Sequence, residues 1–178
     1  MKKLFRLLRY DWPLHFLLLV TNWLPDNVII LRLRGVIIRP FFKSCGSNLR
    51  VGRNLVFYNP SKIAFGSNVY IAYGSWLAAS GSICVGDEVM FGPYVVVTDG
   101  NHTRIDGSFR YGEPERLHIT ISRGSWIGAH SIILGGVSIG KGSVVGSGAT
   151  VIRGEYPDNS FLVGVPAKVK KLIGETIH

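Results

Sequence analysis

The sequence predicts an all-β fold, a parallel β-helix, from a six-residue period, a high glycine content and an insertion of constant length and phase. Apolar residues in the second half recur at six-residue intervals, at Ile121, Ile127, Ile133, Ile139, Val145 and Val151. A small or apolar residue follows each of the first five by four positions, at Ser125, Ser131, Val137, Ser143 and Ala149. Sequence similarity at a fixed period is the signature of a stacked repeat, and both inward positions suit the narrow axis of a coil. The 22 glycines fit a turn that recurs in every coil.

The first half has the same period with a regular interruption. Three sets of hexads begin at Cys45, Phe65 and Val85, so each set starts 20 residues after the one before it. Three hexads account for 18 of these residues, and the other two form an insertion at positions 63–64 and again at 83–84. An insertion at a constant phase indicates three hexads in each triangular coil. A β-sandwich would instead alternate with a period of two.

The extent of the repeat divides the chain into three parts. Residues 1–44 form a basic amphipathic N-terminal segment, residues 45–156 form about five coils, and residues 157–178 form a C-terminal cap. The stretch NVIILRLRG predicts a short helix that stops at Gly35, and VPAKVKKLIGE predicts a C-terminal helix that covers the open coil end.

One interruption of the repeat is much longer than the others. The segment DGNHTRIDGSFRYGEPERLHIT stands outside the pattern, which resumes at Ile121, so residues 98–120 leave the coil and return in register. A loop of this length inside a compact repeat is usually functional. It carries His102, and an imidazole titrates in the range that a general base needs. Asn101 is a turn residue or a group that orients the loop or the substrate, and Asp99 is a candidate to orient the imidazole.

Positive charge is concentrated near the N-terminus. The formal net charge is +9, and residues 1–50 hold nine Lys and Arg against Asp11 and Asp26. This surplus is either a solvated basic end or an attraction to anionic lipid or a polyanionic substrate. Nucleic acid is not an expected partner, because no recognised binding motif accompanies the charge.

The first 20 residues, MKKLFRLLRYDWPLHFLLLV, are apolar enough to raise the question of a transmembrane helix or a signal peptide. The apolar run is too short for a transmembrane helix and lacks the cleavage site of a signal peptide. We expect an amphipathic segment that packs on the protein body or lies at a membrane surface.

The cysteines and histidines limit the cellular compartment and the class of function that the sequence allows. Cys45 and Cys84 define no disulfide framework, which favours the reducing cytoplasm. The five histidines, at positions 15, 102, 118, 130 and 178, contain no closely spaced pair. A zinc enzyme of the carbonic anhydrase type needs three histidine ligands, so we expect no metal site. A purely structural scaffold would not need to interrupt its repeat with a long loop, so the loop argues against a non-enzymatic role.

The residues with the most specific pattern stand near the C-terminus. The stretch GSWIGAHSIILGGVSIGKGSVVGSGATVIRGEYPDNSFLVGVPAKVKK, together with the repeats and the loop dipeptide Asn101-His102, resembles the hexapeptide-repeat acyltransferases. The similarity to galactoside, maltose and colanic-acid-type O-acetyltransferases covers about residues 45–172. It implies left-handed coils and a homotrimer with active sites between neighbouring subunits. It also implies acetyl-CoA bound along the coils and His102 as general base, with Asn101 beside it.

The resemblance implies a set of cofactor-binding residues. The matched positions are Trp126, Ala129, Ser147, Ile152, Arg153, Lys168 and Lys171. Ala129 and Ser147 correspond to positions along the pantetheine arm, and Ile152 and Arg153 to the next contacts, where they replace a small polar residue and a lysine. Trp126 lines the thioester channel or seals the subunit interface. The two lysines meet the nucleotide phosphates or form a solvated face.

Two acceptor classes remain open. The fold, the loop and the basic N-terminus favour O-acetylation of a sugar by a cytoplasmic enzyme, in a surface polysaccharide or its membrane-borne precursor. The string NHTRIDGS also resembles the xenobiotic acetyltransferases that modify streptogramin antibiotics, although the aromatic and Asn-rich continuation of those enzymes is missing.

Overall fold

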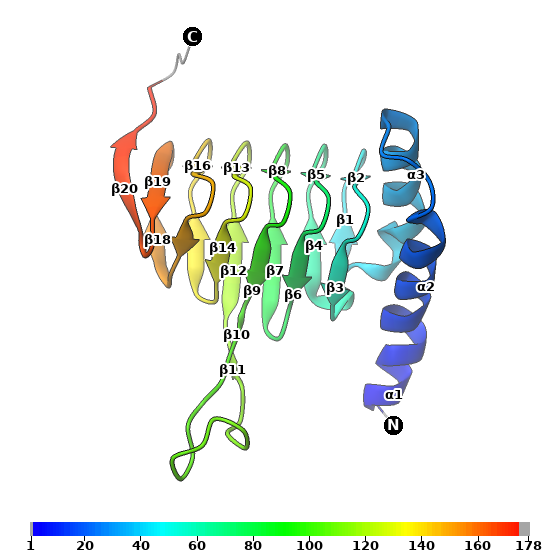
Figure 1. Ribbon diagram of the computed structural model, residues 1–178, viewed down its shortest axis with the longest axis horizontal. Coiled ribbons are helices and arrows are strands. Elements are labelled where there is room, and N and C mark those ends of the chain that lie inside the picture. The colour runs from blue at the N-terminus through cyan, green and yellow to red at the C-terminus, as the bar shows by residue number, and fades with distance from the viewer. Residues whose placement is uncertain (1, 175–178) are drawn as a thin grey trace.

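A computed structural model describes residues 2–174 and shows a solenoid with a layer of helices at one end (Figure 1). Three largely parallel sheets form its faces. The first sheet contains β1 (Ser44–Cys45), β4 (Ile63–Phe65), β7 (Ser82–Val85), β12 (His118–Ile121), β15 (Val137–Ile139) and β18 (Gly154–Tyr156). The second contains β2 (Arg50–Val51), β5 (Tyr70–Ile71), β8 (Met90–Phe91), β13 (Trp126–Ile127), β16 (Val144–Val145), β19 (Ser160–Gly164) and β20 (Ala167–Leu172). The third contains β3 (Val56–Tyr58), β6 (Trp76–Ala78), β9 (Val96–Thr98), β14 (Ile132–Leu134) and β17 (Thr150–Val151). The predicted left-handed parallel β-helix is confirmed.

The hexad residues form the core of this solenoid. Successive coils pair in parallel, so that Phe91 lies beside Ile71 on one side and Ile127 on the other. All three side chains are fully buried. The small inward serines are buried as well, and their hydroxyls donate to backbone carbonyls, as Ser131 does to Gly128 at 2.7 Å. A serine therefore fits the narrow axis without leaving a polar group unsatisfied.

Helices close the N-terminal end of the solenoid. They are α1 (Lys2–Arg6), the π-helical turn η1 (Leu7–Asp11), α2 (Trp12–Thr21), α3 (Val28–Ile38) and η2 (Arg39–Phe41), and one further turn, η3 (Pro60–Lys62), lies within the coils. Leu14, Leu18 and Ile38 are buried and belong to the same core as the coils. This core would otherwise be open to water at its first coil, so the helical layer acts as its cap.

The predicted end of α3 at Gly35 is wrong, because the helix continues to Ile38. Gly35 stands inside the helix and lies against the first coil. A Cβ at this position would stand 1.8 Å from the Leu49 carbonyl oxygen. The glycine permits close packing of helix on coil, which the sequence pattern did not distinguish from a stop signal.

The predicted C-terminal helix is also wrong. Residues of β19 and β20 form an antiparallel pair instead, with Val163 opposite Lys168. Strand β20 covers the edge of the second sheet, which would otherwise be left open. Residues 175–178 of the predicted C-terminal segment, His178 among them, lie outside the described residues.

The solenoid is longer than the five coils predicted from the sequence. Five coils have a strand in all three sheets, and β18 and β19 begin a sixth. The repeat continues because Leu162 takes the apolar inward position six residues after Tyr156, and the buried Ser160 takes the small one. The hexad is one residue short between Val151 and Tyr156, and this irregularity hid the last coil.

Candidate active site

The long loop is anchored by a short antiparallel stem (Figure 1). Strands β10 (Gly100–Asn101) and β11 (Glu115–Arg116) pair at the point where the chain passes from the third sheet to the first. His102 follows β10 directly and is exposed. The side-chain oxygen of Asn101 accepts a hydrogen bond of 3.0 Å from the His102 backbone N–H. Asn101 therefore shapes the turn that presents the imidazole.

Asp99 does not orient that imidazole, contrary to the sequence-based expectation. Its side chain is fully buried and accepts hydrogen bonds from the backbone N–H groups of Ser80 and Gly81. The Asp99 carbonyl also accepts from the Leu117 N–H at 3.1 Å, on the returning strand of the loop. Burial raises the pKa of Asp99, and the two amide donors and nearby Lys62 oppose this rise. Asp99 thus fixes both ends of the loop to the preceding coil.

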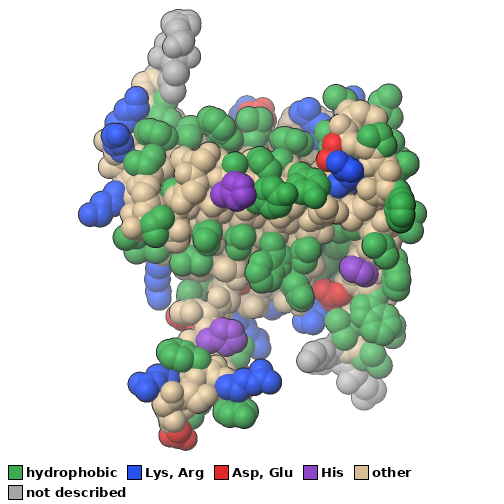
Figure 2. Space-filling model, in the orientation of Figure 1, with side chains coloured by type: hydrophobic (Ala, Val, Ile, Leu, Met, Phe, Trp, Pro, Cys, Tyr) green, Lys and Arg blue, Asp and Glu red, His purple; other side chains and the backbone are tan. Residues whose placement is uncertain are grey.

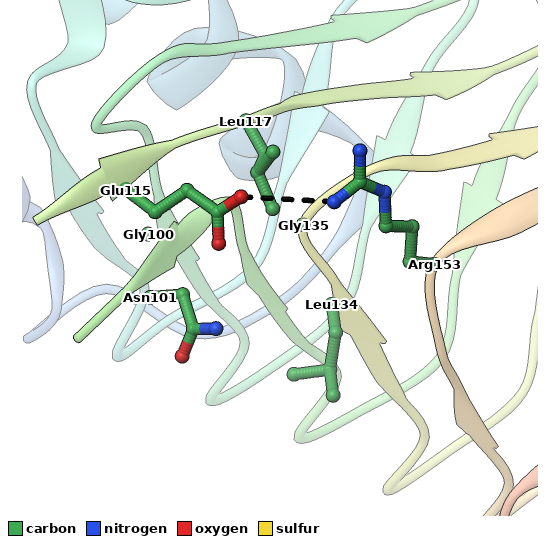
Figure 3. A pocket seen from close by; sticks show the side chains of 7 residues that line it. All are labelled: Gly100, Asn101, Glu115, Leu117, Leu134, Gly135 and Arg153. Carbon is green, nitrogen blue, oxygen red and sulfur yellow. Dashed lines mark ion pairs between the residues drawn. The ribbon is translucent and has the colours of Figure 1, made fainter. Parts of the chain in front are cut away.

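A pocket of about 210 Å³ lies at the base of the stem (Figure 3). It is lined by Gly100, Asn101, Glu115, Leu117, Leu134, Gly135 and Arg153. Arg153 forms an ion pair with Glu115 at 3.6 Å, with both side chains exposed. The pocket therefore brings together one predicted catalytic residue, Asn101, and one predicted cofactor residue, Arg153. Ile152 lies next to it in sequence and is exposed.

Glu115 is a site residue that the sequence reasoning missed. It stands opposite Asn101 in the stem, and its carboxylate points toward Arg153 (Figure 3). In the sequence, only the position of Glu115 within the long loop pointed to a functional role. The pairing of β10 with β11 lies outside the hexad repeat, so the repeat could not predict it.

A second, apolar pocket of about 270 Å³ lies on the outer face of the second sheet. It is lined by Trp126, Val144, Phe161, Lys171 and Ile173. Two predicted cofactor residues, Trp126 and Lys171, therefore border one pocket. Lys168 is exposed on the same edge strand, β20.

The other predicted cofactor residues lie at the turns between the second and third sheets. Ala129 follows β13 and Ser147 follows β16, in successive coils. The Ala129 carbonyl accepts a hydrogen bond of 2.9 Å from the Gly148 N–H, so the two turns are stacked. Within one chain the predicted site residues therefore fall into two groups. One group lies at the stem pocket, at the corner between the third and first sheets. The other lies on the outer surface of the second sheet and at the corner between the second and third sheets.

The other described histidines near the loop have structural contacts. The Nδ1 atom of His118 lies 2.7 Å from the Ser82 hydroxyl on the neighbouring strand. His130 stacks on Tyr94 with ring centroids 5.0 Å apart. Across the described residues 2–174, no group of three His, Cys, Asp or Glu side chains is placed to hold a metal ion.

Comparison with known proteins agrees with this architecture. Residues 118–153 match the family described as bacterial transferase hexapeptide (six repeats). The galactoside O-acetyltransferase of Escherichia coli (strain K12) is 31% identical over 142 residues, which cover 80% of this chain and 70% of that protein. WbbJ of the same organism, named for O-acetyl transfer in lipopolysaccharide biosynthesis, is 31% identical over 134 residues, or 68% of this chain and 66% of that protein.

A solved structure has the same fold along nearly the whole chain. A galactoside acetyltransferase in complex with coenzyme A superposes with a TM-score of 0.81 at 29% identity, over 93% of this chain and 81% of that one. The solenoid and its long loop define a transferase of the left-handed β-helix class. The chain belongs to the hexapeptide-repeat acetyltransferase family.

The comparisons also bear on the predicted activity. The relatives are named acetyltransferases and the solved neighbour holds coenzyme A, which agrees with the predicted class of acetyl-CoA-dependent O-acetyltransferase. The chain spans 57%, 70% and 66% of the lengths of three curated relatives.

Proposed function

We propose that the protein transfers the acetyl group of acetyl-CoA to a hydroxyl group of a sugar, with His102 as general base. The observation that carries this proposal is the exposed His102 imidazole on a stem fixed by Asp99, beside a pocket that contains Asn101 and Arg153. The imidazole takes the hydroxyl proton as the alcohol oxygen attacks the thioester carbonyl. The C–S bond then breaks, and the proton passes from the imidazole to the departing thiolate.

The residues suited to hold acetyl-CoA are apolar near the thioester and basic toward the nucleotide. Trp126 and Phe161 offer an apolar wall, and Lys171 borders it. Lys168 and Arg153 supply further positive charge, which suits the phosphates of the cofactor. The stacked turns of Ala129 and Ser147 leave room for the thin pantetheine arm, since both residues are small.

The proposal includes a homotrimer, which the separation of the two parts of the site supports. His102 projects from the corner between the third and first sheets, whereas Trp126 lies on the outer face of the second sheet. A rotational arrangement of copies lets the loop of one subunit meet the second sheet of its neighbour. The shared site then contains both halves.

The proposed acceptor is a sugar unit of a surface polysaccharide or of its membrane-borne precursor. Support comes from the relatives named for galactoside acetylation and for lipopolysaccharide biosynthesis. We place the enzyme in the cytoplasm, where acetyl-CoA is available and where the free thiols of Cys45 and Cys84 stay reduced. The second candidate acceptor is an antibiotic hydroxyl, which the NHTRIDGS string of the loop favours.

The test is release of free CoA from acetyl-CoA in the presence of a panel of sugars and a streptogramin. His102→Ala is expected to lose roughly 100- to 10,000-fold in kcat. His118→Ala, a histidine at the other end of the loop, keeps most of the activity because its contact is with Ser82. Equal activity of the two variants contradicts the role of His102, and turnover of the streptogramin alone selects the second acceptor class.

A further inference from the structure

The helical layer has a large apolar face that points away from the solenoid. Exposed large apolar side chains recur along one side of the first helical stretch, at Leu4, Phe5, Leu8, Trp12, Phe16, Leu19, Val20 and Trp23. A second row follows on α3, at Val28, Ile29, Leu33 and Val36. We call these two rows the helical outer face. Figure 2 shows hydrophobic side chains gathered along this end of the molecule. A contiguous apolar surface of this kind marks a binding surface.

The inner side of the same helices is fixed to the first coil. Leu14 and Leu18 are buried in the core, and Arg34 is fully buried. The Arg34 guanidinium donates to the carbonyls of Thr21 at 3.0 Å and Val51 at 3.3 Å, which joins both helices to β2. The outer face is therefore held in place by a rigid body and cannot fold inward to bury itself.

The charge around this face is positive. The two acids of the layer are already paired, Asp11 with Arg6 at 3.2 Å and Asp26 with Arg34. Arg9 and Arg32 are exposed beside the apolar rows, and among the described residues neither forms an ion pair. The face thus combines large apolar side chains with a surplus of positive charge that the local acids do not offset.

The composition of the first helical stretch and the length of α3 fit a bilayer surface and not its interior. The contiguous elements α1, η1 and α2 span 20 residues but include the charged Arg6, Arg9 and Asp11, and α3 contains only 11 residues, whereas a span needs about 20 predominantly apolar residues. Within residues 2–174 no helix has the length and apolarity to cross a membrane. Tryptophan side chains such as Trp12 and Trp23 are enriched at the level of lipid headgroups, where an amphipathic helix lies in the plane of the interface.

We infer that the helical outer face binds the surface of an anionic lipid bilayer. A second copy of the chain is the less suitable occupant, because a symmetric contact would bring the unpaired arginines of both copies together. This inference goes beyond the proposed function, since it concerns a surface remote from the cofactor residues.

The experiment is co-sedimentation of the full chain with vesicles of phosphatidylcholine alone or mixed with phosphatidylglycerol. The test variant is the double substitution Phe16→Ser and Trp23→Ser, which changes side chains that are 59% and 89% exposed. The matched control is Phe109→Ser and Tyr111→Ser in the loop, at 59% and 81% exposure. The test variant is expected to bind mixed vesicles at least about 10-fold more weakly, and the control to bind like the unaltered chain.

A second measurement, fluorescence quenching, begins with the unaltered chain. Brominated lipid in the mixed vesicles is expected to quench the tryptophan fluorescence of the unaltered chain, and Trp23→Phe to reduce that quenching. Arg9→Glu with Arg32→Glu is expected to weaken binding to mixed vesicles, as does added salt. Equal binding of test and control variants overturns the inference. So does equal binding to neutral vesicles, or a loss of oligomer mass in the Phe16→Ser, Trp23→Ser variant, which would assign the face to a second copy.

Discussion

The carboxylate of Asp99 accepts a hydrogen bond of 2.8 Å from the backbone N–H of Gly81, one coil earlier in the solenoid. Gly81 itself lies against the returning end of the loop, where a Cβ would stand 2.0 Å from the Leu117 carbonyl oxygen. Asp99, Gly81 and Leu117 therefore form one packed unit at the base of the stem. The position of His102 depends on this unit, because the stem begins immediately after Asp99.

Replacing Asp99 with asparagine tests the anchor. The amide can accept from only one of the two N–H groups, and its own NH₂ group faces the other, so we expect a loss of about 1–3 kcal/mol in the free energy of unfolding. We also expect kcat to fall about 10-fold or more, because a small displacement of a catalytic group is costly. Urea unfolding and the CoA-release assay measure the two effects.

The control is Asp87→Asn, because the exposed Asp87 also accepts a hydrogen bond from a backbone N–H group, that of Ser67 at 2.6 Å. A similar loss of stability and activity in Asp87→Asn would mean that Asp99 has no special role.

The pH dependence of stability provides an independent check on the same residue. Burial raises the pKa of Asp99 above its ordinary value of 3.8, so the folded state binds this proton more tightly than the unfolded chain. The stabilisation by that proton is fully present below 3.8 and is lost as the pH rises through the raised pKa. The difference in unfolding free energy between the unaltered chain and Asp99→Asn is therefore expected to shrink as the pH rises through this window. A difference that is constant with pH would mean that the pKa of Asp99 is the same in both states.

The ion pair of Arg153 with Glu115 leads to a prediction about the cofactor. Arg153→Gln is expected to raise KM for acetyl-CoA about 10-fold through loss of a charged contact. Both side chains are exposed, so the free energy of unfolding is expected to change by less than ~1 kcal/mol. Arg123→Gln is the matched control, because Arg123 forms an exposed pair with Glu88 at 3.0 Å away from the stem pocket. An unchanged KM in Arg153→Gln would remove this residue from the cofactor site.

The sequence predicted the parts of the molecule that have a period. Every hexad residue from Val51 to Val151 that defined the repeat is buried, because an inward position in a narrow coil accepts only certain side chains. Contacts between segments distant in sequence have no period and could not be predicted. The ion pair of Glu115 with Arg153 is one such contact. The role of Gly35 is another, since its proximity to Leu49 depends on how α3 packs on the first coil.

The C-terminal segment shows a different limit of prediction from sequence, that of local secondary-structure propensity. Its residues suit a helix by composition, but the open edge of β19 supplies hydrogen-bonding partners that an isolated helix would not use. Tertiary context thus overrides local propensity at the end of the solenoid. The same limit applies to the cofactor residues, which the sequence named one by one without showing that they lie on different faces of the chain.

The buried Arg34 makes a prediction about the helical layer. Arg34→Met removes the buried guanidinium that donates to Asp26 and to the carbonyls of Thr21 and Leu24, and we expect a loss of about 3 kcal/mol in the free energy of unfolding. Arg53→Met is the control, because Arg53 pairs with the same Asp26 at 3.5 Å but is 41% exposed. We expect it to cost less than ~1 kcal/mol. Equal losses in urea unfolding would show that Arg34 does not hold the layer to the coil.

The separation of His102 from Trp126 predicts that inactive subunits can complement each other. In a site shared by neighbouring subunits, one copy supplies the imidazole and the next supplies the tryptophan surface. His102→Ala and Trp126→Ala chains are each expected to have little activity. When equal amounts are unfolded and refolded together, about a quarter of the shared sites should contain both intact residues by random assembly.

The control for complementation is a mixture that can form no intact site. His102→Ala refolded with a chain that carries both substitutions has no source of the imidazole and is expected to stay inactive. Light scattering on the unaltered chain is expected to give three times the chain mass. If the first mixture has only the summed activity of its components, both halves of the site belong to one subunit. The loop would then have to bend across a corner of the solenoid, against the anchor that Asp99 forms with Ser80 and Gly81.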